Sequence, residues 1–214
     1  MDRSRRTTRD TYDRISAHFA KTREYAWPEV ESFVADAPAG ERGLDLGCGN
    51  ARHAEVLTSK CDHVVGLDLS RGLLDTARER ATGRDFAVDL VQGDASRLPI
   101  RDDSVDLAVY VATLHHLPTR EARRASLNEL ARVLTPGGRA LVSVWSTAHD
   151  TFDREESFDT EVDWTLPGGV TVPRYYHIYS PDEFDADLES SDCTVLHSEL
   201  SSGNCYATIT ASEQ

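Results

Sequence analysis

Lysine is almost absent from this chain of 214 residues: only Lys21 and Lys60 occur, and the other basic side chains are arginines and histidines. Acidic residues outnumber lysine and arginine by 37 to 23, so the formal net charge is −14. An acidic surface with little lysine suits a protein that stays soluble in concentrated salt, where charge repulsion is strongly screened. We therefore expect a halophilic host, such as a halophilic archaeon; an acidic mesophilic enzyme is the alternative. Unfolding that is no harder in molar salt than in dilute buffer would refute the halophile hypothesis.

Long apolar runs are also missing, because no stretch of 18 apolar residues occurs. A membrane span is not expected, and the basic N-terminus is not followed by the apolar core of a signal peptide. The cysteines lack the paired spacing of a metal site; they are Cys48, Cys61, Cys193 and Cys205. We expect reduced thiols, no bound metal and a cytoplasmic location. The length fits one domain over residues 1–214.

The overall negative charge of the chain argues against a nucleic-acid partner, since contacts with phosphate groups need cationic side chains. The arginines are nevertheless unevenly distributed. One set lies within residues 3–23, and a second consists of Arg120, Arg123, Arg124 and Arg132. A local basic rim on an acidic body therefore stays open as a possibility, although a solvated surface position is the simpler interpretation of any one arginine.

Hydrophobic periodicity predicts helices that alternate with strands. Expected helices are 8–22, from 27–28 to about 35, 51–58, 71–80, 120–134 and 181–188; expected strands are 64–68, 86–92, 105–112, 139–145, 195–200 and 205–210. This alternation implies a parallel, doubly wound α/β sheet. Residues 1–35 would form an N-terminal helical cap. Residues 147–172 are polar and turn-rich, which predicts an insertion that acts as a lid or substrate-facing loop. Residues 201–204 predict a hairpin turn.

A glycine-rich turn follows the first apolar run, at residues 43–50. Gly47 and Gly49 let the backbone turn tightly and bring its N–H groups close to a ligand, and the helix beyond favours an acidic group. Two acids, Asp68 and Asp94, follow at the ends of later apolar runs. Asp68 stands 21 residues after Gly47, where dinucleotide and nucleoside folds place an acid on ribose hydroxyls.

Four segments together resemble the class I S-adenosylmethionine-dependent methyltransferases: Leu44–Gly49, Gly66–Asp68, Gln92–Ala95 and Leu130–Gly138. The resemblance implies one Rossmann-like domain with a seven-stranded, mostly parallel sheet and an antiparallel last strand. It also implies S-adenosyl-L-methionine as cofactor. The residues that would bind it are Asp45, Gly47, Cys48 and Gly49 near the methionine part, Asp68 and Leu69 near the ribose, Asp94 and Ala95 near the adenine, and Val111. Ala51 departs from the pattern, because many relatives have a third glycine there. A nicotinamide-binding domain, the alternative, has no role for the Pro136-Gly137-Gly138 turn.

Three further clusters stand outside these segments. They are Tyr12-Asp13, His18-Phe19, Thr22-Arg23 and Trp27-Pro28 near the N-terminus; Leu114-His115-His116-Leu117 after the fourth strand; and Arg174-Tyr175-Tyr176-His177 after the insertion. Ligands of open α/β sheets bind beyond the carboxyl strand ends, so the histidine pair is expected to face a substrate. Adjacent residues cannot both point into one pocket in extended geometry, which makes one histidine structural. Tyr12 and Phe19 have a plain alternative role in packing the first helix.

These clusters are similar to those of the transfer-RNA carboxymethyluridine methyltransferases, which make the methyl ester of 5-carboxymethyluridine at the wobble position. A carboxylate is already ionised at neutral pH, so the site needs to orient it rather than deprotonate it. By the resemblance, Arg23 and Arg174 would hold the carboxylate, and His115 or His116, with Tyr175 and His177, would steer the uridine in the anticodon loop. Alternatives are a small-molecule methyltransferase of the quinone or sterol type and a catalytically silent cofactor-binding scaffold.

The same family implies a protein partner, a small zinc-binding activator of methyltransferases. It would dock on the third strand, Asp85–Gln92, at the sheet edge. An uncovered apolar edge strand promotes aggregation. We therefore expect the chain to be poorly soluble alone and to be rescued by co-expression with the partner.

Overall fold

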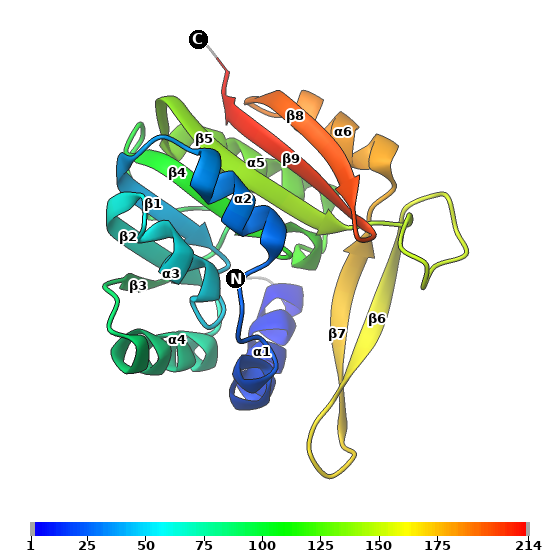
Figure 1. Cartoon of the computed structure of the whole chain (residues 1–214). Helices are drawn as coiled ribbons and strands as arrows, with labels where there is room; N and C mark the ends of the chain where they lie inside the picture. Colours follow the sequence, from blue (N-terminus) through cyan, green and yellow to red (C-terminus); the bar gives the residue numbers. More distant parts are fainter. Residues whose placement is uncertain (1–2, 213–214) are drawn as a thin grey trace.

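Parallel strands alternate with helices along the chain, and the computed structural model assembles the strands into a seven-stranded sheet (Figure 1). In sheet order they are β3 (Asp89–Gln92), β2 (Cys61–Asp68), β1 (Gly40–Leu46), β4 (Val105–Val111), β5 (Leu134–Trp145), β9 (Asn204–Ala211) and β8 (Cys193–Ser201). Strand β9 is antiparallel to β5 and β8, whereas the other pairs are parallel. The predicted fold class is thereby confirmed. The structure describes residues 3–212, so residues 1–2 of the predicted cap and 213–214 of the predicted domain lie outside it.

Helices cover both faces of the sheet (Figure 1). They are α1 (Arg3–Lys21), α2 (Pro28–Asp36), α3 (Arg52–Leu57), α4 (Arg71–Arg84), α5 (Arg120–Val133) and α6 (Pro181–Glu189), with a 3-10 turn η1 (Leu114–His116). Successive residues of β4 face opposite layers, as the pleat requires. Val109 packs in the cluster that contains Leu57 of α3, and Tyr110 in the cluster that contains Leu127 of α5. None of the helices in the described range has the length and apolarity needed to cross a membrane.

Two predicted boundaries need correction. The third strand covers Asp89–Gln92 only, because α4 continues to Arg84 and ends at Asp85, whose φ is 56°. Residues 86–88 therefore connect α4 to β3 at the sheet edge and are not part of the strand. Strand β5 starts at Leu134 instead of Arg139 and contains a register shift against β4. The predicted β8–β9 hairpin is confirmed, and its two central residues, Ser202 and Gly203, both have positive φ, as a tight hairpin turn requires.

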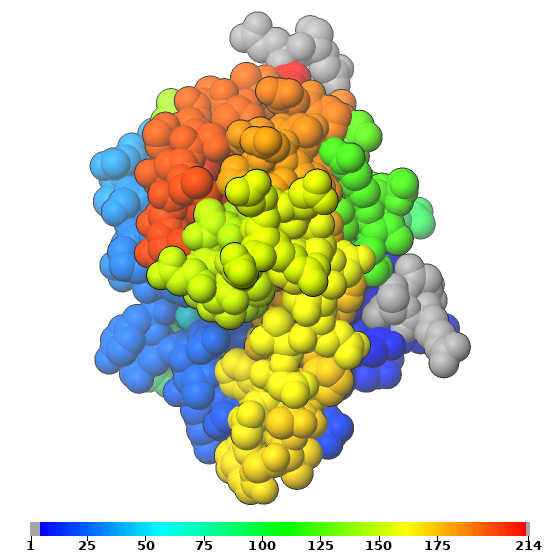
Figure 2. Space-filling model, turned by 90° about the vertical axis from the view of Figure 1, so that its right-hand side faces the viewer, coloured from blue at the N-terminus to red at the C-terminus, as the bar shows by residue number. Residues whose placement is uncertain are grey.

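The predicted insertion at 147–172 is not an irregular loop throughout. It contains β6 (Phe158–Thr165), which pairs with β7 (Thr171–Ile178) in a separate antiparallel sheet. The hairpin projects beyond the main sheet and lies beside α1 (Figures 1 and 2). Phe158, Val162 and Trp164 alternate with acidic residues along β6, so a period-two signal was present within an acidic segment. The hairpin carries aromatic side chains toward the site described below.

Helix α6 is held to α5 by a buried carboxylate. Asp187 is fully buried; it accepts hydrogen bonds from Arg120 Nε (2.6 Å) and from the Tyr179 hydroxyl (3.2 Å). Removing the carboxylate leaves the buried hydroxyl without its acceptor. We expect Asp187→Ala to lower the free energy of unfolding by about 1–3 kcal/mol in denaturant titrations. Exposed Asp185, on the same helix, supplies the control Asp185→Ala; equal destabilisation by both variants would contradict the assignment.

Candidate active site

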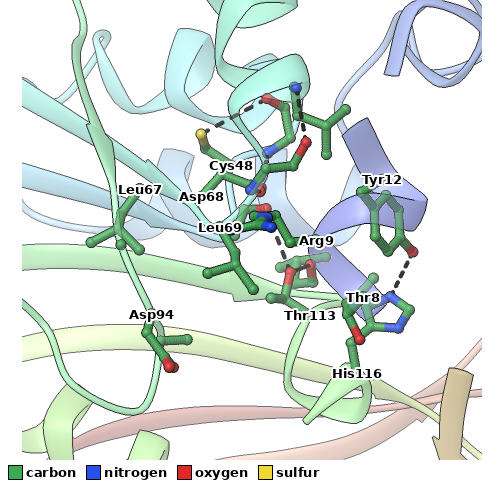
Figure 3. Close-up of a pocket in the computed structure, with 18 of the residues that line it drawn as sticks. Thr8, Arg9, Tyr12, Cys48, Leu67, Asp68, Leu69, Asp94, Thr113 and His116 are labelled. Carbon is green, nitrogen blue, oxygen red and sulfur yellow. Dashed lines mark hydrogen bonds between the residues drawn. The ribbon is translucent and has the colours of Figure 1, made fainter. Parts of the chain in front are cut away.

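The glycine turn after β1 forms the floor of a pocket at the carboxyl ends of β1, β2 and β4 (Figure 3). Gly47 and Gly49 have φ of 74° and 54°. A Cβ atom on Gly47 would overlap the side chain of Thr113, so this position is restricted to glycine by space as well as by conformation. The carbonyl oxygen of Leu67 accepts the N–H groups of Gly47 (2.7 Å) and Cys48 (3.0 Å), which ties the turn to β2.

Ala51, where many relatives have glycine, precedes α3 with φ of 61°. The predicted helix therefore begins at Arg52, and alanine holds a left-handed conformation that glycine would adopt without strain. Asp45 stabilises this irregular helix start, because its Oδ2 accepts the Ala54 N–H (2.8 Å). Asp45 is 1% exposed and does not line the pocket. In this structure Asp45 shapes the turn from behind, and its contact with the cofactor stays a prediction.

Burial raises the pKa of Asp45 to about 7. Because the folded state then retains a proton that the unfolded state has released, the resulting stabilisation is complete below about pH 4 and declines as pH rises to about 7. We expect the stability of the wild type relative to Asp45→Asn to fall over this range, by about 1.4 kcal/mol for each unit of pKa shift. Denaturant titrations at several pH values measure this difference. A stability difference between wild type and Asp45→Asn that does not change with pH would contradict the expectation. Asp62→Asn, at an exposed position, is the matched control and should show no such change with pH.

Asp68 connects the end of β2 to the glycine turn. Its Oδ2 accepts the Gly49 N–H (2.9 Å) and its Oδ1 accepts the Ser70 N–H (2.8 Å). Burial raises the pKa of Asp68 to about 6, although both amide hydrogen bonds act in the opposite direction. Each carboxylate oxygen keeps a lone pair for a further donor, so Asp68 can still accept hydrogen bonds from ribose hydroxyls. Figure 3 shows Asp68 and Leu69 beside the glycine turn.

Asp94 marks the far end of the pocket. Its Oδ1 accepts the Ser96 N–H (2.9 Å), and its Oδ2 lies 2.6 Å from Arg5 Nη1 on α1. Helix α1 thus covers the pocket, although none of its residues was predicted as a cofactor contact. It contributes five lining residues: Arg5, Thr8, Arg9, Tyr12 and Phe19. Eight predicted cofactor residues also line the pocket: Gly47, Cys48, Gly49, Asp68, Leu69, Asp94, Ala95 and Val111.

The two adjacent histidines have different roles. His115 is 2% exposed, and its Nδ1 accepts the Trp145 N–H (3.0 Å), so it is a structural residue. His116 lines the pocket. Its Nδ1 lies 2.8 Å from the carbonyl oxygen of Tyr175 and must donate, which leaves Nε2 to accept the Tyr12 O–H at 2.9 Å (Figure 3). Burial lowers the pKa of His116 to about 4, consistent with this neutral form.

Strand alternation divides the Arg-Tyr-Tyr-His segment of β7 between two faces. Arg174 and Tyr176 face α1, where Arg174 Nη1 donates to the Tyr176 hydroxyl (2.6 Å). Tyr175 and His177 point the other way, and both bind Asp159 Oδ1, at 2.8 and 2.7 Å. Both side chains are thus engaged with Asp159, and their contact with the substrate stays a prediction. Only the carbonyl oxygen of Tyr175 reaches the site, through His116.

The hairpin brings the two predicted arginines together on one indole ring. Arg174 and Arg23 lie 4.8 and 5.5 Å from the ring centroid of Trp164, measured from the guanidinium carbon. Trp164 Nε1 donates to His18 Nδ1 (3.0 Å), which anchors the hairpin to α1. Phe19, which lines the pocket, packs on the same indole. Sequence reasoning missed Trp164, because it lies within the segment interpreted as an insertion.

The polar groups that line the pocket thus fit S-adenosylmethionine by chemistry. Main-chain turns and Asp68 lie at one side, Asp94 at the far end, and the Tyr12–His116 pair beside Thr113 (Figure 3). Within residues 3–212 no group of three or more His, Cys, Asp or Glu side chains is arranged to hold a metal ion. The four cysteines are buried free thiols.

Comparison with known proteins agrees with this geometry. A family model described as "Methyltransferase domain" matches residues 44–142. The mouse tRNA (carboxymethyluridine(34)-5-O)-methyltransferase ALKBH8 is 34% identical over 147 residues, which cover 69% of this chain and 21% of that protein. The Saccharomyces cerevisiae protein of the same enzyme name is 32% identical over 167 residues, covering 76% and 58%. The Schizosaccharomyces pombe one is 27% identical over 208 residues, covering 86% and 87%. The chain spans about a fifth of the length of the vertebrate relatives.

Solved structures share the fold. The CcbJ methyltransferase of Streptomyces caelestis superposes with a TM-score of 0.73 at 19% identity, covering 97% of this chain and 98% of that one. A putative methyltransferase in complex with the Haloferax volcanii Trm112 methyltransferase activator gives a TM-score of 0.72 at 18% identity, covering 97% and 98%. At these identities the likeness concerns architecture alone.

Proposed function

This chain belongs to the class I S-adenosylmethionine-dependent methyltransferases, and from that premise we propose that it methylates the carboxylate of 5-carboxymethyluridine at the wobble position of transfer RNA. The product would be the methyl ester. The enzyme names of the relatives support the nucleoside, and the acceptor group is argued from the chemistry of the pocket.

The observation that carries the proposal is that neither member of the Tyr12–His116 pair is a suitable general base. The pKa of His116 lies near 4, so this imidazole is a weak base. Burial, and then the neighbouring Tyr176, raises the pKa of Tyr12 well above its usual range, so the phenol stays protonated. A hydroxyl or amine acceptor would need a base with a pKa close to 7. A carboxylate with a pKa of about 4 is already ionised and needs none.

Arg174 and Arg23 supply the groups that orient such an acceptor. Arg174 is 8% exposed, and its Nε has no hydrogen-bond partner among the described residues, so one donor stays available for a carboxylate oxygen. Trp164, packed against both guanidinium groups, gives an aromatic surface for a base turned out of a single-stranded loop. Bound S-adenosylmethionine would supply an electrophilic methyl group on a sulfonium. Arg174 and Arg23 would hold the acceptor carboxylate in line with that group, and this transfer requires no proton to be removed from the acceptor.

Methyl transfer to total transfer RNA tests the proposal. The chain, with S-adenosylmethionine labelled in the methyl group, should label transfer RNA that carries carboxymethyluridine, and the label should be released by mild alkali after digestion to nucleosides. Alkali-stable label on a base carbon or ring nitrogen would refute the ester. Label transferred only to small molecules would favour a small-molecule enzyme, and cofactor binding without any transfer would favour a silent scaffold.

We also propose that a small zinc-binding activator protein docks on β3. This strand is at the sheet edge, and its Leu90 and Val91 are only partly buried. Edge strands with apolar side chains are commonly covered by a partner. Co-expression with the activator should raise soluble yield, and Leu90→Glu should cancel the gain. A soluble, fully active lone chain would contradict the proposal.

A further inference from the structure

A second cavity opens beside the cofactor pocket, in the connection between α1 and α2. Its lining includes the cationic residues Lys21, Arg23 and Arg52 and the aromatic residues Tyr25 and Trp27. Arg52 also lines the cofactor pocket, so the two cavities share a wall. We call this cavity the Lys21–Arg52 groove. It lies outside the segments that were assigned to the cofactor or to the acceptor carboxylate, apart from Arg23.

The positive charge of the groove is uncompensated. Within residues 3–212 no carboxylate lies within 4.0 Å of Lys21, Arg23 or Arg52, although the chain carries a net charge of −14. The acid that lines the groove, Glu24, binds Arg84 Nη2 at 3.0 Å. Buried Asp45 acts on Arg52 only from a longer distance. The groove is thus a local cationic site on an acidic body.

The second arginine set differs in this respect. Three of its four arginines, Arg120, Arg123 and Arg132, are each paired with a carboxylate, for example Arg123 with Glu183 at 3.2 Å. The fourth, Arg124, donates to the carbonyl oxygen of Ser190 (2.8 Å). Most of the positive charge of a basic rim on α5 is therefore compensated. Burial is the main cause that lowers the pKa of Arg52 to about 10; the charge of Arg23 acts in the same direction and that of Asp45 in the opposite one.

Aromatic rings accompany the cations. Tyr25 is 74% exposed, and Trp27 packs under Arg52, whose guanidinium carbon lies 5.5 Å from the indole centroid. An exposed tyrosine beside cations is the combination with which single-stranded nucleic acids are held, since phosphates pair with the cations and bases stack on the ring. A small anion such as a carboxylate would use the cations but would leave Tyr25 without a role.

We propose that the Lys21–Arg52 groove binds a phosphodiester group of the RNA strand next to the acceptor nucleotide, with the flanking base stacked on Tyr25. The inference rests on the proposed function and adds a second contact point on the RNA. Arg23 lies between the two sites, because it lines the groove and also contacts Phe19 and Trp164 beside the acceptor. The strand would therefore run across the start of α2, on the side of the pocket opposite Asp94.

Binding of an anticodon stem-loop that contains carboxymethyluridine tests the proposal, with S-adenosylhomocysteine present so that no transfer occurs. The titration is repeated at several salt concentrations, from the lowest at which the chain stays folded. Lys21→Ala should weaken binding and reduce the slope of log affinity against log salt by about 0.7, the value for one lost phosphate contact on a single strand. Tyr25→Ala should weaken binding about fivefold or more with the slope unchanged.

Arg78→Ala is the matched control, because Arg78 is an exposed arginine on α4 that pairs only with Asp75 of the same helix. It should change neither affinity nor slope. Unchanged RNA binding in Lys21→Ala and Tyr25→Ala, while the wild type labels transfer RNA, would overturn the groove and leave the proposed function intact. A wild type that neither binds nor labels RNA would overturn both. Loss of affinity for S-adenosylhomocysteine, with RNA binding kept, would assign the groove to the cofactor's carboxylate instead.

Discussion

Replacement of Arg174 by alanine is expected to lower kcat/KM for methyl transfer to transfer RNA by a factor of about 100, the cost of misplacing a reacting group by about 1 Å. Arg174 is buried against Trp164, and its Nε is available to an acceptor. The guanidinium could orient a carboxylate in line with the methyl group while the carboxylate stays ionised. The measurement is initial-rate kinetics with carboxymethyluridine-containing transfer RNA.

Three controls separate this role from a loss of folding. The affinity of Arg174→Ala for S-adenosylhomocysteine should stay close to that of the wild type. Arg174→Lys keeps the charge but loses the planar fork, so it should restore only a small part of the rate. Arg154→Ala removes an exposed arginine that stacks on Phe158 elsewhere in the chain, and it should be nearly neutral. Transfer by Arg174→Ala within fivefold of the wild type would exclude Arg174 from the acceptor site.

Substitution of Asp68 by alanine is expected to raise the Kd for S-adenosylhomocysteine by about 30-fold or more, as for truncation of a buried, hydrogen-bonded charge. The carboxylate accepts hydrogen bonds from the Gly49 and Ser70 amides, and its remaining lone pairs would accept hydrogen bonds from the ribose hydroxyls. Its pKa near 6 adds a pH dependence. Affinity in the wild type should rise with pH through about 6, because the ionised form accepts hydrogen bonds more strongly.

Calorimetric titration between pH 5 and 8 measures both effects. Asp75→Asn, on the exposed surface of α4, is the control and should bind as the wild type does. A Kd for Asp68→Ala that stays within threefold of the wild type, or a wild-type affinity that falls with rising pH, would contradict the assignment of Asp68 to the ribose.

Sequence reasoning could place in the pocket those residues whose position depends only on the nearby backbone. Gly47, Gly49, Asp68 and Asp94 follow strands directly, and the carboxyl ends of parallel strands meet at one edge of a sheet. Their place in the pocket follows from short-range pattern alone. Asp45 belongs to the same pattern but points behind the turn to Ala54, because neighbouring side chains on a strand face opposite sides.

The acceptor side depends on contacts between segments far apart in the chain. Nothing local in the Arg-Tyr-Tyr-His segment tells which pair of side chains faces α1; the register of β7 against β6 sets it. Likewise, Trp164 joins Arg23 to Arg174 only because the hairpin folds back along α1. The fold class and the turns that line the pocket were therefore predictable from hydrophobic periodicity and turn chemistry. Which side chains of β7 face α1 was not, since long-range packing chooses between two strand faces that the residue pattern leaves equivalent.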